Sequence, residues 1–345
     1  MAECTGKSQT KSETSPKSPE IAILLSTYNG EMYVEELLNS LRDQKYQNWD
    51  LWIRDDGSGD NTVAIIKQFQ TKLAALGRKN SVYLTEGENI GVTGSFFTLA
   101  EAAERNYDAF AFCDQDDIWH PDKLERAASA LQAYQADSSG SSSSDDEKPF
   151  LYHCRQWMVS DEQPSVRKMS PIPKRTGFEN ALVQNQVVGC TMVINPALRH
   201  MMLKAFRRYG IDVSAHVIMH DWWCYLLTSA FGVIHYDPHP SISFRRHHHS
   251  SSPAATGFLT ALEQRAAKMQ TRSWSVIHIL NQANCFRQLH GECNLSKMQH
   301  RLLHDIVRLK KAGLSFRLKY FIFGRHHRST RMETLIFRFL VVMAR

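Results

Sequence analysis

The residues with the most evident chemistry are Asp114, Asp116 and Asp117, three carboxylates within four positions. They directly follow the apolar, aromatic-rich segment 110–113, a pattern that predicts a buried strand. Carboxylates after such a strand lie where open α/β sheets bind ligands. Three negative charges this close repel one another, and a divalent cation with oxygen ligands, Mg²⁺ or Mn²⁺, would neutralise them. The run therefore indicates either a metal site for a phosphate-bearing substrate or an acidic surface turn.

Strand and helix patterns alternate over the first 135 residues. Apolar runs of strand type are separated by segments whose apolar residues recur three and four positions apart, as they do in helices. This alternation predicts an α/β fold with a largely parallel sheet and helices on both faces. Each strand ends in polar or acidic residues, so Thr27, Asp56 and the acids at 114–117 are expected along one edge of the sheet. The predicted strands are 21–25, 51–53, 81–84 and 110–113.

Shorter signals continue the pattern in the second half of the α/β region. Residues 150–159 and 233–236 have strand composition. Gly189 predicts a tight turn or a close backbone approach, followed by a strand and then by a helix that starts at Pro196. A further apolar helix begins at His220-Asp221 and is expected to end at Gly232.

Composition divides the chain into three parts. Residues 1–19 form a polar tail of disordered type, and 20–250 form the α/β domain, with a flexible Ser-rich insertion at 136–149. Residues 256–345 form a helical, basic region. From Arg245 onward the chain holds 18 Lys and Arg against 4 Asp and Glu, whereas the preceding part carries a net charge of −8.

The basic C-terminal region predicts a partner or a surface. Its Lys and Arg residues alternate with Leu, Ile and Phe at helical spacing, which is typical of amphipathic helices at an anionic membrane surface. Packing on the α/β domain or on a second copy would use the same apolar residues. No apolar run reaches the roughly 18 residues that span a bilayer. A nucleic-acid partner is not expected, because no recognition motif accompanies the charge.

The cysteines and the first residues indicate a compartment. The seven cysteines are scattered and contain no Cys-x-x-Cys pair, which argues against a disulfide framework and a zinc ribbon. The first 20 residues are polar and do not resemble a secretory signal. We therefore expect a cytoplasmic protein, peripheral on the cytoplasmic face of the inner membrane.

Several stretches, taken in order, resemble a known enzyme family. The chain is similar to the family 2 glycosyltransferases of GT-A fold, in particular to the rhamnosyltransferase-like branch of bacterial surface polysaccharide synthesis. The likeness covers roughly residues 20–250, and Asp-Gln-Asp-Asp-x-Trp is its most specific motif. The matching segments are Leu25-Ser26-Thr27-Tyr28-Asn29-Gly30, Arg54-Asp55-Asp56-Gly57-Ser58, Asn89-Ile90-Gly91, Asp114 to Trp119 with Pro121 to Leu124, Gly189-Cys190-Thr191 and His220-Asp221-Trp222-Trp223.

The resemblance implies a role for each matching position. Asp221 would be the catalytic base of an inverting transfer, although its place near a helix start also suits an N-cap. Asp116 would hold the metal, with Asp117 as a second ligand. Asp114 would reach the ribose of the nucleotide, and Asp56 would hydrogen-bond the base. The remaining nucleotide-side positions implied by the resemblance are Thr27, Tyr28, Asn29, Asp55 and Asn89.

The basic motif at residues 244–249 matches the family only in part. Arg245 would contact the diphosphate and His247 the metal, whereas Phe244, Arg246, His248 and His249 depart from the family's Tyr-Arg-Gln-His-Gly-Asn pattern. A zinc site at the three adjacent histidines is not expected, because no Cys or His partners stand at suitable spacing. Residues 55–60 resemble a calcium loop, but the Glu that closes such loops is missing.

These features together predict a metal-dependent inverting glycosyltransferase. The expected donor is dTDP-rhamnose, and the expected acceptor is a saccharide, free or on a lipid carrier, in polysaccharide synthesis. Two alternatives stay open: transfer of another UDP or dTDP sugar, and a non-catalytic sugar-nucleotide-binding protein of the same fold.

Overall fold

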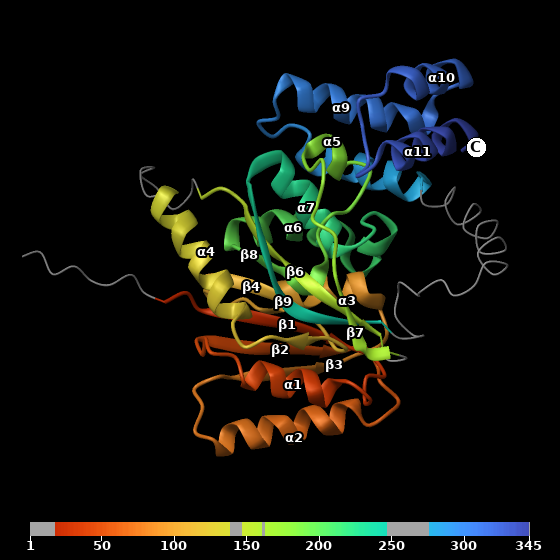
Figure 1. Cartoon of the computed structure of the whole chain (residues 1–345). Helices are drawn as coiled ribbons and strands as arrows, with labels where there is room; N and C mark the ends of the chain where they lie inside the picture. The colour runs from red at the N-terminus through yellow and green to blue at the C-terminus, as the bar shows by residue number, and fades with distance from the viewer. Residues whose placement is uncertain (1–17, 139–146, 161–162, 247–275, 345) are drawn as a thin grey trace, which may run out of the picture.

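A computed structural model describes residues 18–138, 147–160, 163–246 and 276–344. One sheet forms the centre of this part of the chain, with the strand order β3-β2-β1-β4-β8-β6-β9-β5 and β7 paired to β6 (Figure 1). The strands are β1 (Ile21–Thr27), β2 (Trp49–Asp55), β3 (Val82–Glu86), β4 (Ala109–Asp114), β5 (Ile118–Trp119), β6 (Phe150–Ser160), β7 (Gln163–Met169), β8 (Met192–Ile194) and β9 (Val233–Arg246).

Helices cover both faces of this sheet and extend beyond it. Figure 1 shows α1 and α2 on one side, α3, α6 and α7 on the other, and the C-terminal helices stacked beyond α5 and α7. The helices are α1 (Val34–Arg42), α2 (Thr62–Ala75), α3 (Gly91–Ala102), α4 (Lys123–Ser138), α5 (Phe178–Ala181), α6 (Pro196–Tyr209), α7 (His220–Phe231), α9 (Lys297–Arg308), α10 (Leu314–Phe323) and α11 (Arg331–Met343). Residues 276–290 are also helical. Within the described residues, no helix combines the length and apolar character needed to cross a bilayer.

The sheet is mixed. Strands β3, β2, β1 and β4 are parallel, as the sequence predicted, but β8 pairs antiparallel with both β4 and β6. In the parallel half, Thr27 lies opposite Asp55 and Ser26 opposite Asp114. The predicted alignment of polar strand ends along one edge is therefore confirmed.

Successive side chains of strand β1 point alternately into two apolar cores. Ile21, Ile23 and Leu25 belong to the core that includes buried residues of α1, α2 and α4. Ala22 and Leu24 belong to the core that includes buried residues of α3, α6 and α7. All five side chains are fully buried, which is why the run reads as continuously apolar rather than alternating.

The C-terminal helices share the second of these cores. Leu302 and Ile306 of α9 and Phe337 and Leu340 of α11 are buried in the same cluster as Trp223 of α7. Packing on the α/β domain, one of the alternatives left open by the sequence, therefore accounts for one face of these helices.

Two strands differ from the sequence-based expectation. The predicted strand 233–236 is longer than expected: it extends to Arg246 as β9, which pairs with β6 across register shifts. Strand β7 was not expected, because its Pro, Ser, Arg and Lys residues carry no strand signal. The turn at Gly189 and the helix start at Pro196 are confirmed. The histidines at 247–249 and the segment 256–275 lie outside the described residues.

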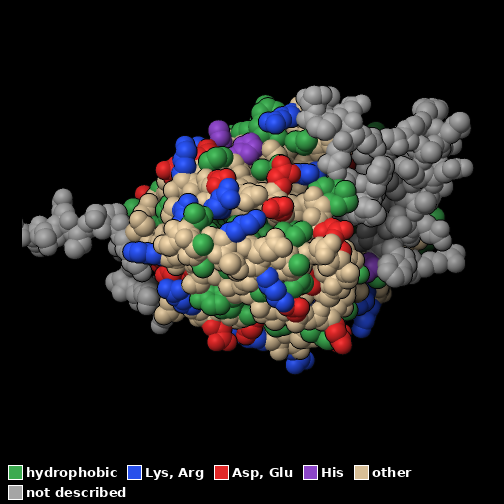
Figure 2. Space-filling view, turned by 90° about the horizontal axis from the view of Figure 1, so that it is seen from below, with side chains coloured by type: hydrophobic (Ala, Val, Ile, Leu, Met, Phe, Trp, Pro, Cys, Tyr) green, Lys and Arg blue, Asp and Glu red, His purple; other side chains and the backbone are tan. Residues whose placement is uncertain are grey.

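The face of the molecule below the sheet carries a mixed charge pattern. Figure 2 looks from below onto the α1 and α2 side, where basic and acidic side chains are interspersed. Such mixed surfaces produce only a small net field.

Gly232 ends α7 and fixes its exit into β9. Its N–H donates to the carbonyl of Thr228 at 2.9 Å, and a Cβ at this position would lie 2.0 Å from the carbonyl oxygen of Pro149.

We expect Gly232→Ala to lower the free energy of unfolding by about 1–3 kcal/mol, because backbone must move to accept the methyl group. Urea denaturation measures this change. Gly313→Ala is the matched control, because a Cβ there meets no atom within 4 Å. Equal stability of the two variants would contradict the prediction.

Candidate active site

The end of β4 and the loop after it hold the central acids. Oxygen atoms of Asp114 and Asp117 lie, together with the Sγ of Cys190, within 4.8 Å of one another. Asp117 is only 1% exposed, and its Oδ1 accepts the backbone N–H of Arg245 at 3.3 Å. Its Oδ2 is buried and has no hydrogen-bond partner among the residues that the structure describes. A buried carboxylate oxygen without a partner is costly. The acidic-surface-turn alternative is therefore wrong for Asp117.

The acids raise one another's pKa values. Burial, then the charges of Asp116 and Asp221, raises the pKa of Asp114 to about 7. Burial, followed by Asp116 and Asp114, raises the pKa of Asp117 well above its usual value. These pKa shifts place Asp221 within electrostatic range of the β4 acids, so the fold brings both predicted carboxylate centres into one site.

The donor set fits a hard divalent cation. Such a cation would compensate the mutual repulsion of the acids and satisfy the orphaned Oδ2 of Asp117. Cys190 lies close enough to be a ligand, but burial raises the pKa of its thiol, and a protonated thiol is a poor partner for Mg²⁺ or Mn²⁺.

A buried lysine lies behind the acids. Lys123 is fully buried at the start of α4, and its Nζ is 3.8 Å from the ring centroid of Trp119, with no hydrogen-bond partner within the described residues. Burial lowers its pKa, and the charge of Asp117 opposes that shift. Sequence reasoning placed Lys123 in a family motif but gave it no role. The structure brings it within electrostatic range of Asp117, where a protonated amine favours the ionised carboxylate.

Asp221 lies in the first turn of α7, which starts after Met219, so it is not the N-cap. Its Oδ2 accepts the N–H of Gly189 at 3.0 Å, and its Oδ1 accepts the N–H of Trp222 at 2.6 Å. Burial raises its pKa to about 6, and these hydrogen bonds oppose the rise. The carboxylate is therefore held in place, ionised above about pH 6, and close to the acids of β4.

The position of Asp221 depends on its neighbour His220. The His220 ring lies 4.1 Å from the Phe96 centroid and 4.9 Å from the Phe112 centroid, fully inside the core. A Cβ on Gly189 would lie 2.7 Å from the Nε2 of His220. The close approach that the sequence predicted at Gly189 is therefore confirmed, and it allows the Gly189 N–H to reach Asp221.

Asp55 and Asn29 join the ends of β1 and β2. Asp55 accepts the hydroxyl of Thr27 at 2.9 Å and both the N–H and the hydroxyl of Ser58, at 2.7 and 2.6 Å. Asn29 has φ 47°, its N–H donates to the Ser58 hydroxyl at 2.8 Å, and its Oδ1 accepts the N–H of Gly59 at 2.8 Å. The two loops thus form one rigid rim, as a pocket wall requires.

Asp56 faces inward at the end of β2. It pairs with Arg54 and accepts the N–H groups of Ile90 at 3.0 Å and Gly91 at 2.9 Å. Asn89, exposed in the same loop, accepts the Gly91 N–H at 3.1 Å. Asp56 therefore ties the Asn89 loop to the sheet, and its predicted contact with a nucleotide base stays a prediction.

Gln115 is a site residue that sequence reasoning missed. Its side chain accepts the N–H of Tyr28 at 2.8 Å and donates to the carbonyl of Tyr28 at 2.9 Å. A Cβ on Gly30 would lie 2.3 Å from the Gln115 Oε1, so the glycine makes room for this contact. The side chain of Tyr28 itself is 47% exposed and free to stack on a ligand.

Arg245 approaches the acids through its backbone. Its guanidinium pairs with Glu36 at 2.5 Å and lies 4.9 Å from the Tyr33 ring centroid. The predicted diphosphate contact of this side chain stays a prediction, and His247 lies outside the described residues.

Comparisons with known proteins match one family over much of the chain. The model of Glycosyl transferase family 2 matches residues 22–204, more than half of the chain. The dTDP-rhamnosyl transferase RfbG of Shigella flexneri is 27% identical over 241 residues, 68% of this chain and 75% of that protein. The putative teichuronic acid biosynthesis glycosyltransferase TuaG of Bacillus subtilis is 28% identical over 176 residues, 51% of this chain and 62% of that protein.

A solved structure shares the fold. The crystal structure of S. aureus TarS 1-349 in complex with UDP-GlcNAc matches with a TM-score of 0.51 and 15% identity, covering 89% of this chain and 74% of that one. The GT-A fold expected from the sequence is confirmed.

The raised pKa of Asp114 predicts a pH-dependent stability. Its folded value of about 7 exceeds the ordinary 3.8, so the folded protein binds the extra proton between these values. The stability associated with Asp114 is therefore full below pH 3.8 and is lost as the pH rises through about 7. In EDTA and above pH 7, we expect Asp114→Asn to have a higher free energy of unfolding than the parent protein. The difference is at most about 1.4 kcal/mol for each pH unit that separates the two pKa values of Asp114.

Denaturant unfolding of both proteins across this pH range measures the gap, which should close towards acid pH. Buried histidines with lowered pKa values, such as His153 and His220, affect both proteins alike. The control is Asp212→Asn, an exposed acid that should give no gap. A gap that widens as the pH falls would contradict the assignment.

Proposed function

We propose that this chain, which belongs to glycosyl transferase family 2, is a metal-dependent inverting enzyme. It would move a sugar from a nucleotide-sugar to a glycan acceptor. The observation that carries this proposal is the meeting of two carboxylate centres at one sheet edge. Asp114 and Asp117 form an oxygen-rich cluster, and Asp221 stands apart from it, held by two backbone N–H groups.

Asp221 is the proposed general base. Its pKa of about 6 leaves it ionised near neutral pH, yet basic enough to take a proton from an acceptor hydroxyl. The hydroxyl oxygen then forms a bond to the anomeric carbon, while the bond from that carbon to the diphosphate oxygen breaks on the opposite side. The proton remains on Asp221, and the electron pair leaves with the nucleoside diphosphate.

The acids at the end of β4 are the proposed donor side. Asp116 and Asp117 would hold Mg²⁺ or Mn²⁺, with Asp114 towards the ribose. When bound, the cation neutralises the charge that develops on the leaving diphosphate. The rim formed by Thr27, Tyr28, Asn29 and Asp55 would line the nucleotide pocket together with Asp56 and Asn89.

The proposed donor is dTDP-rhamnose. Support comes from the similarity to RfbG, which is a dTDP-rhamnosyl transferase, over 68% of this chain. Another UDP or dTDP sugar is the alternative. The similarity to TuaG, a putative teichuronic acid biosynthesis enzyme, supports a saccharide acceptor of a surface polysaccharide. We place the reaction at the cytoplasmic face of the inner membrane, with an acceptor on a lipid carrier.

Removing the base should stop transfer. We expect Asp221→Asn to lower kcat by about 10²–10⁴-fold, because an amide cannot accept the proton. Initial rates of nucleoside diphosphate release with the acceptor present measure this loss, and circular dichroism checks the fold. Asp212→Asn is the control, because it makes the same change at an exposed acid nearby in the chain. A near-normal rate in Asp221→Asn would remove the base assignment.

The donor and the metal can be tested together by thermal shift. A ligand that binds only the folded state adds about 2.7 kcal/mol at 100 times its Kd. We expect dTDP-rhamnose with Mn²⁺ to raise the Tm more than UDP-GlcNAc or UDP-galactose, and Asp117→Asn to remove the Mn²⁺-dependent part. A larger shift with a UDP sugar would support the alternative donor. No shift with any nucleotide-sugar would contradict the proposed function.

A further inference from the structure

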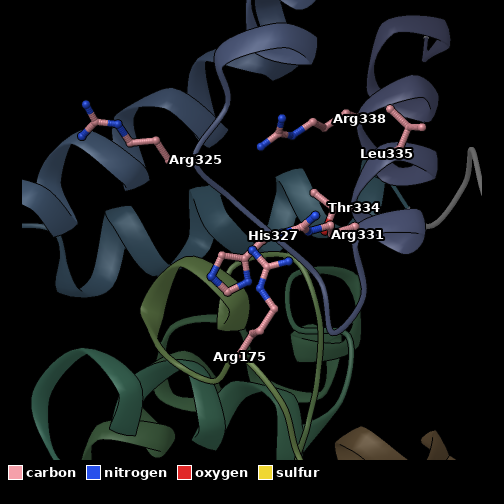
Figure 3. A pocket seen from close by; sticks show the side chains of 7 residues that line it. All are labelled: Arg175, Arg325, His327, Arg331, Thr334, Leu335 and Arg338. Carbon is pink, nitrogen blue, oxygen red and sulfur yellow. The ribbon is translucent and has the colours of Figure 1, made fainter.

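A basic pocket lies between α11, the turn that precedes it, and the loop before α5 (Figure 3). Its volume is about 250 Å³. Four arginines and one histidine line it, from segments far apart in the sequence: Arg175, Arg325, His327, Arg331 and Arg338. In Figure 3, Arg175 rises from the loop below, while Arg331 and Arg338 extend from α11 above.

The arginines of this pocket have no carboxylate partner among the described residues. Within the described parts of the chain, none of the four arginines forms an ion pair with a carboxylate. Arg325 donates to the Met298 Sδ at 3.2 Å, and Arg338 donates to backbone carbonyls, with its Nε buried and unpaired. The histidine of the pocket lies near an acid: the Oε1 of Glu179 is 3.4 Å from the Nε2 of His327.

Such a cluster is typical of a phosphate site. Arg175, Arg331 and Arg338 carry like charges that repel one another unless an anion joins them, whereas the Arg325 guanidinium points away from them in Figure 3. Guanidinium groups also match phosphate oxygens in a forked geometry. Arg175 adds a second signal, because its φ of 54° lies in the left-handed region that side chains other than Gly, Asn and Asp rarely adopt. Backbone held in this region is found most often at ligand sites.

The helix that forms one wall of the pocket is apolar on two faces. Phe337, Leu340 and Val341 of α11 are buried in the core. The opposite face is exposed and equally apolar: Met332 at 66%, Leu335 at 50%, Ile336 at 38%, Phe339 at 49% and Met343 at 62%. We call these five residues the α11 stripe. Leu335 belongs to both the stripe and the pocket, so the apolar surface and the cations are contiguous.

The neighbouring helix α10, which packs against α11, has a similar exposed face. Leu314, Leu318 and Ile322 recur at helical spacing and are 63%, 47% and 63% exposed. Soluble surfaces rarely expose apolar side chains in such continuous rows. An apolar face rimmed by Arg and Lys is the arrangement by which helices lie in a membrane interface.

We propose that this pocket binds the phosphate group of an anionic membrane lipid while the α11 stripe lies in the membrane interface. A soluble phosphate would satisfy the arginines but leave the stripe exposed to water. A protein partner would need to supply both an acidic group and an apolar surface. An anionic bilayer already has its negatively charged headgroups directly beside its apolar interior.

We infer a role in acceptor capture for this membrane site, and that role rests on the proposed function. Residues 175–189 form one segment that starts at the pocket and ends at Gly189, the hydrogen-bond partner of Asp221. Between them, the Ala181 carbonyl accepts the indole N–H of Trp222 at 2.7 Å, next to the proposed base. Binding at the pocket would therefore hold the acceptor side of the active site at the membrane, where a lipid-linked saccharide is found.

The test is sedimentation with vesicles of phosphatidylglycerol and phosphatidylcholine in equal parts. We expect Arg175→Glu/Arg331→Glu to lower the partition coefficient by about 10-fold or more, because each basic residue near an anionic surface contributes to binding. Arg175→Lys/Arg331→Lys, which keeps the charge, should lose less. The control is Arg78→Glu/Lys79→Glu, the same charge change at exposed residues after α2, which should leave binding unchanged.

A second variant tests the stripe. Leu335→Ser/Phe339→Ser should weaken binding to the vesicles, whereas its affinity for inorganic pyrophosphate, measured by calorimetry, should equal that of the parent protein. Vesicles of phosphatidylcholine alone should bind neither protein well. Equal vesicle binding by the parent protein and Arg175→Glu/Arg331→Glu would overturn the proposal. Pyrophosphate binding that needs the arginines, without any effect of either variant on vesicles, would overturn it in favour of a soluble anion.

Donor hydrolysis without vesicles separates this inference from the proposed function. Arg175→Glu/Arg331→Glu should hydrolyse the nucleotide-sugar at the parent rate and melt at the parent Tm. Loss of vesicle binding with normal hydrolysis would support the membrane site. If no nucleotide-sugar shifts the Tm of the parent protein, the proposed function fails, and the vesicle data still decide the membrane site.

Discussion

Carboxylates held close together and away from water are the constraint on which the site depends. The parallel strands β1, β2 and β4 end at one edge of the sheet, and their register brings Asp55, Asp56 and Asp114 together there. Burial raises the pKa values of Asp114 and Asp221, and the charge of Asp221 adds to the rise at Asp114. The folded chain offsets this repulsion only in part, through backbone N–H groups and the buried Lys123. A site with such a residual negative charge favours a cation.

Neighbouring acids serve different purposes, and their hydrogen bonds distinguish them. Asp55 and Asp56 are occupied by Ser58, Arg54 and the Ile90 loop, so they act as framework. Asp117 keeps an oxygen without a partner in the interior, which is the property expected of a ligand. Asp221 is anchored but not ion-paired, which is the property expected of a base. The resemblance implies a contact of Asp56 with the nucleotide base; its carboxylate also accepts the N–H groups of Ile90 and Gly91, and the base contact stays a prediction.

Local sequence predicted the parallel half of the sheet well, because five consecutive apolar residues in β1 leave little choice of structure. It also placed the acids at one edge and the close approach at Gly189. It could not predict that α7 returns Asp221 to that edge, since the antiparallel strand β8 and the packing of His220 on Phe96 set this position. The basic pocket had no local signal at all, because its arginines come from 175 and from 325–338. Only tertiary packing joins them.

The most direct test of a single displacement driven by Asp221 is the anomeric configuration of the product. The one-bond coupling between the anomeric carbon and its proton, measured by NMR on the purified product and on the nucleotide-sugar donor, reports both configurations. Attack of the acceptor oxygen opposite the diphosphate predicts opposite configurations in donor and product. The same configuration in both would contradict the role of Asp221 as the base for that attack.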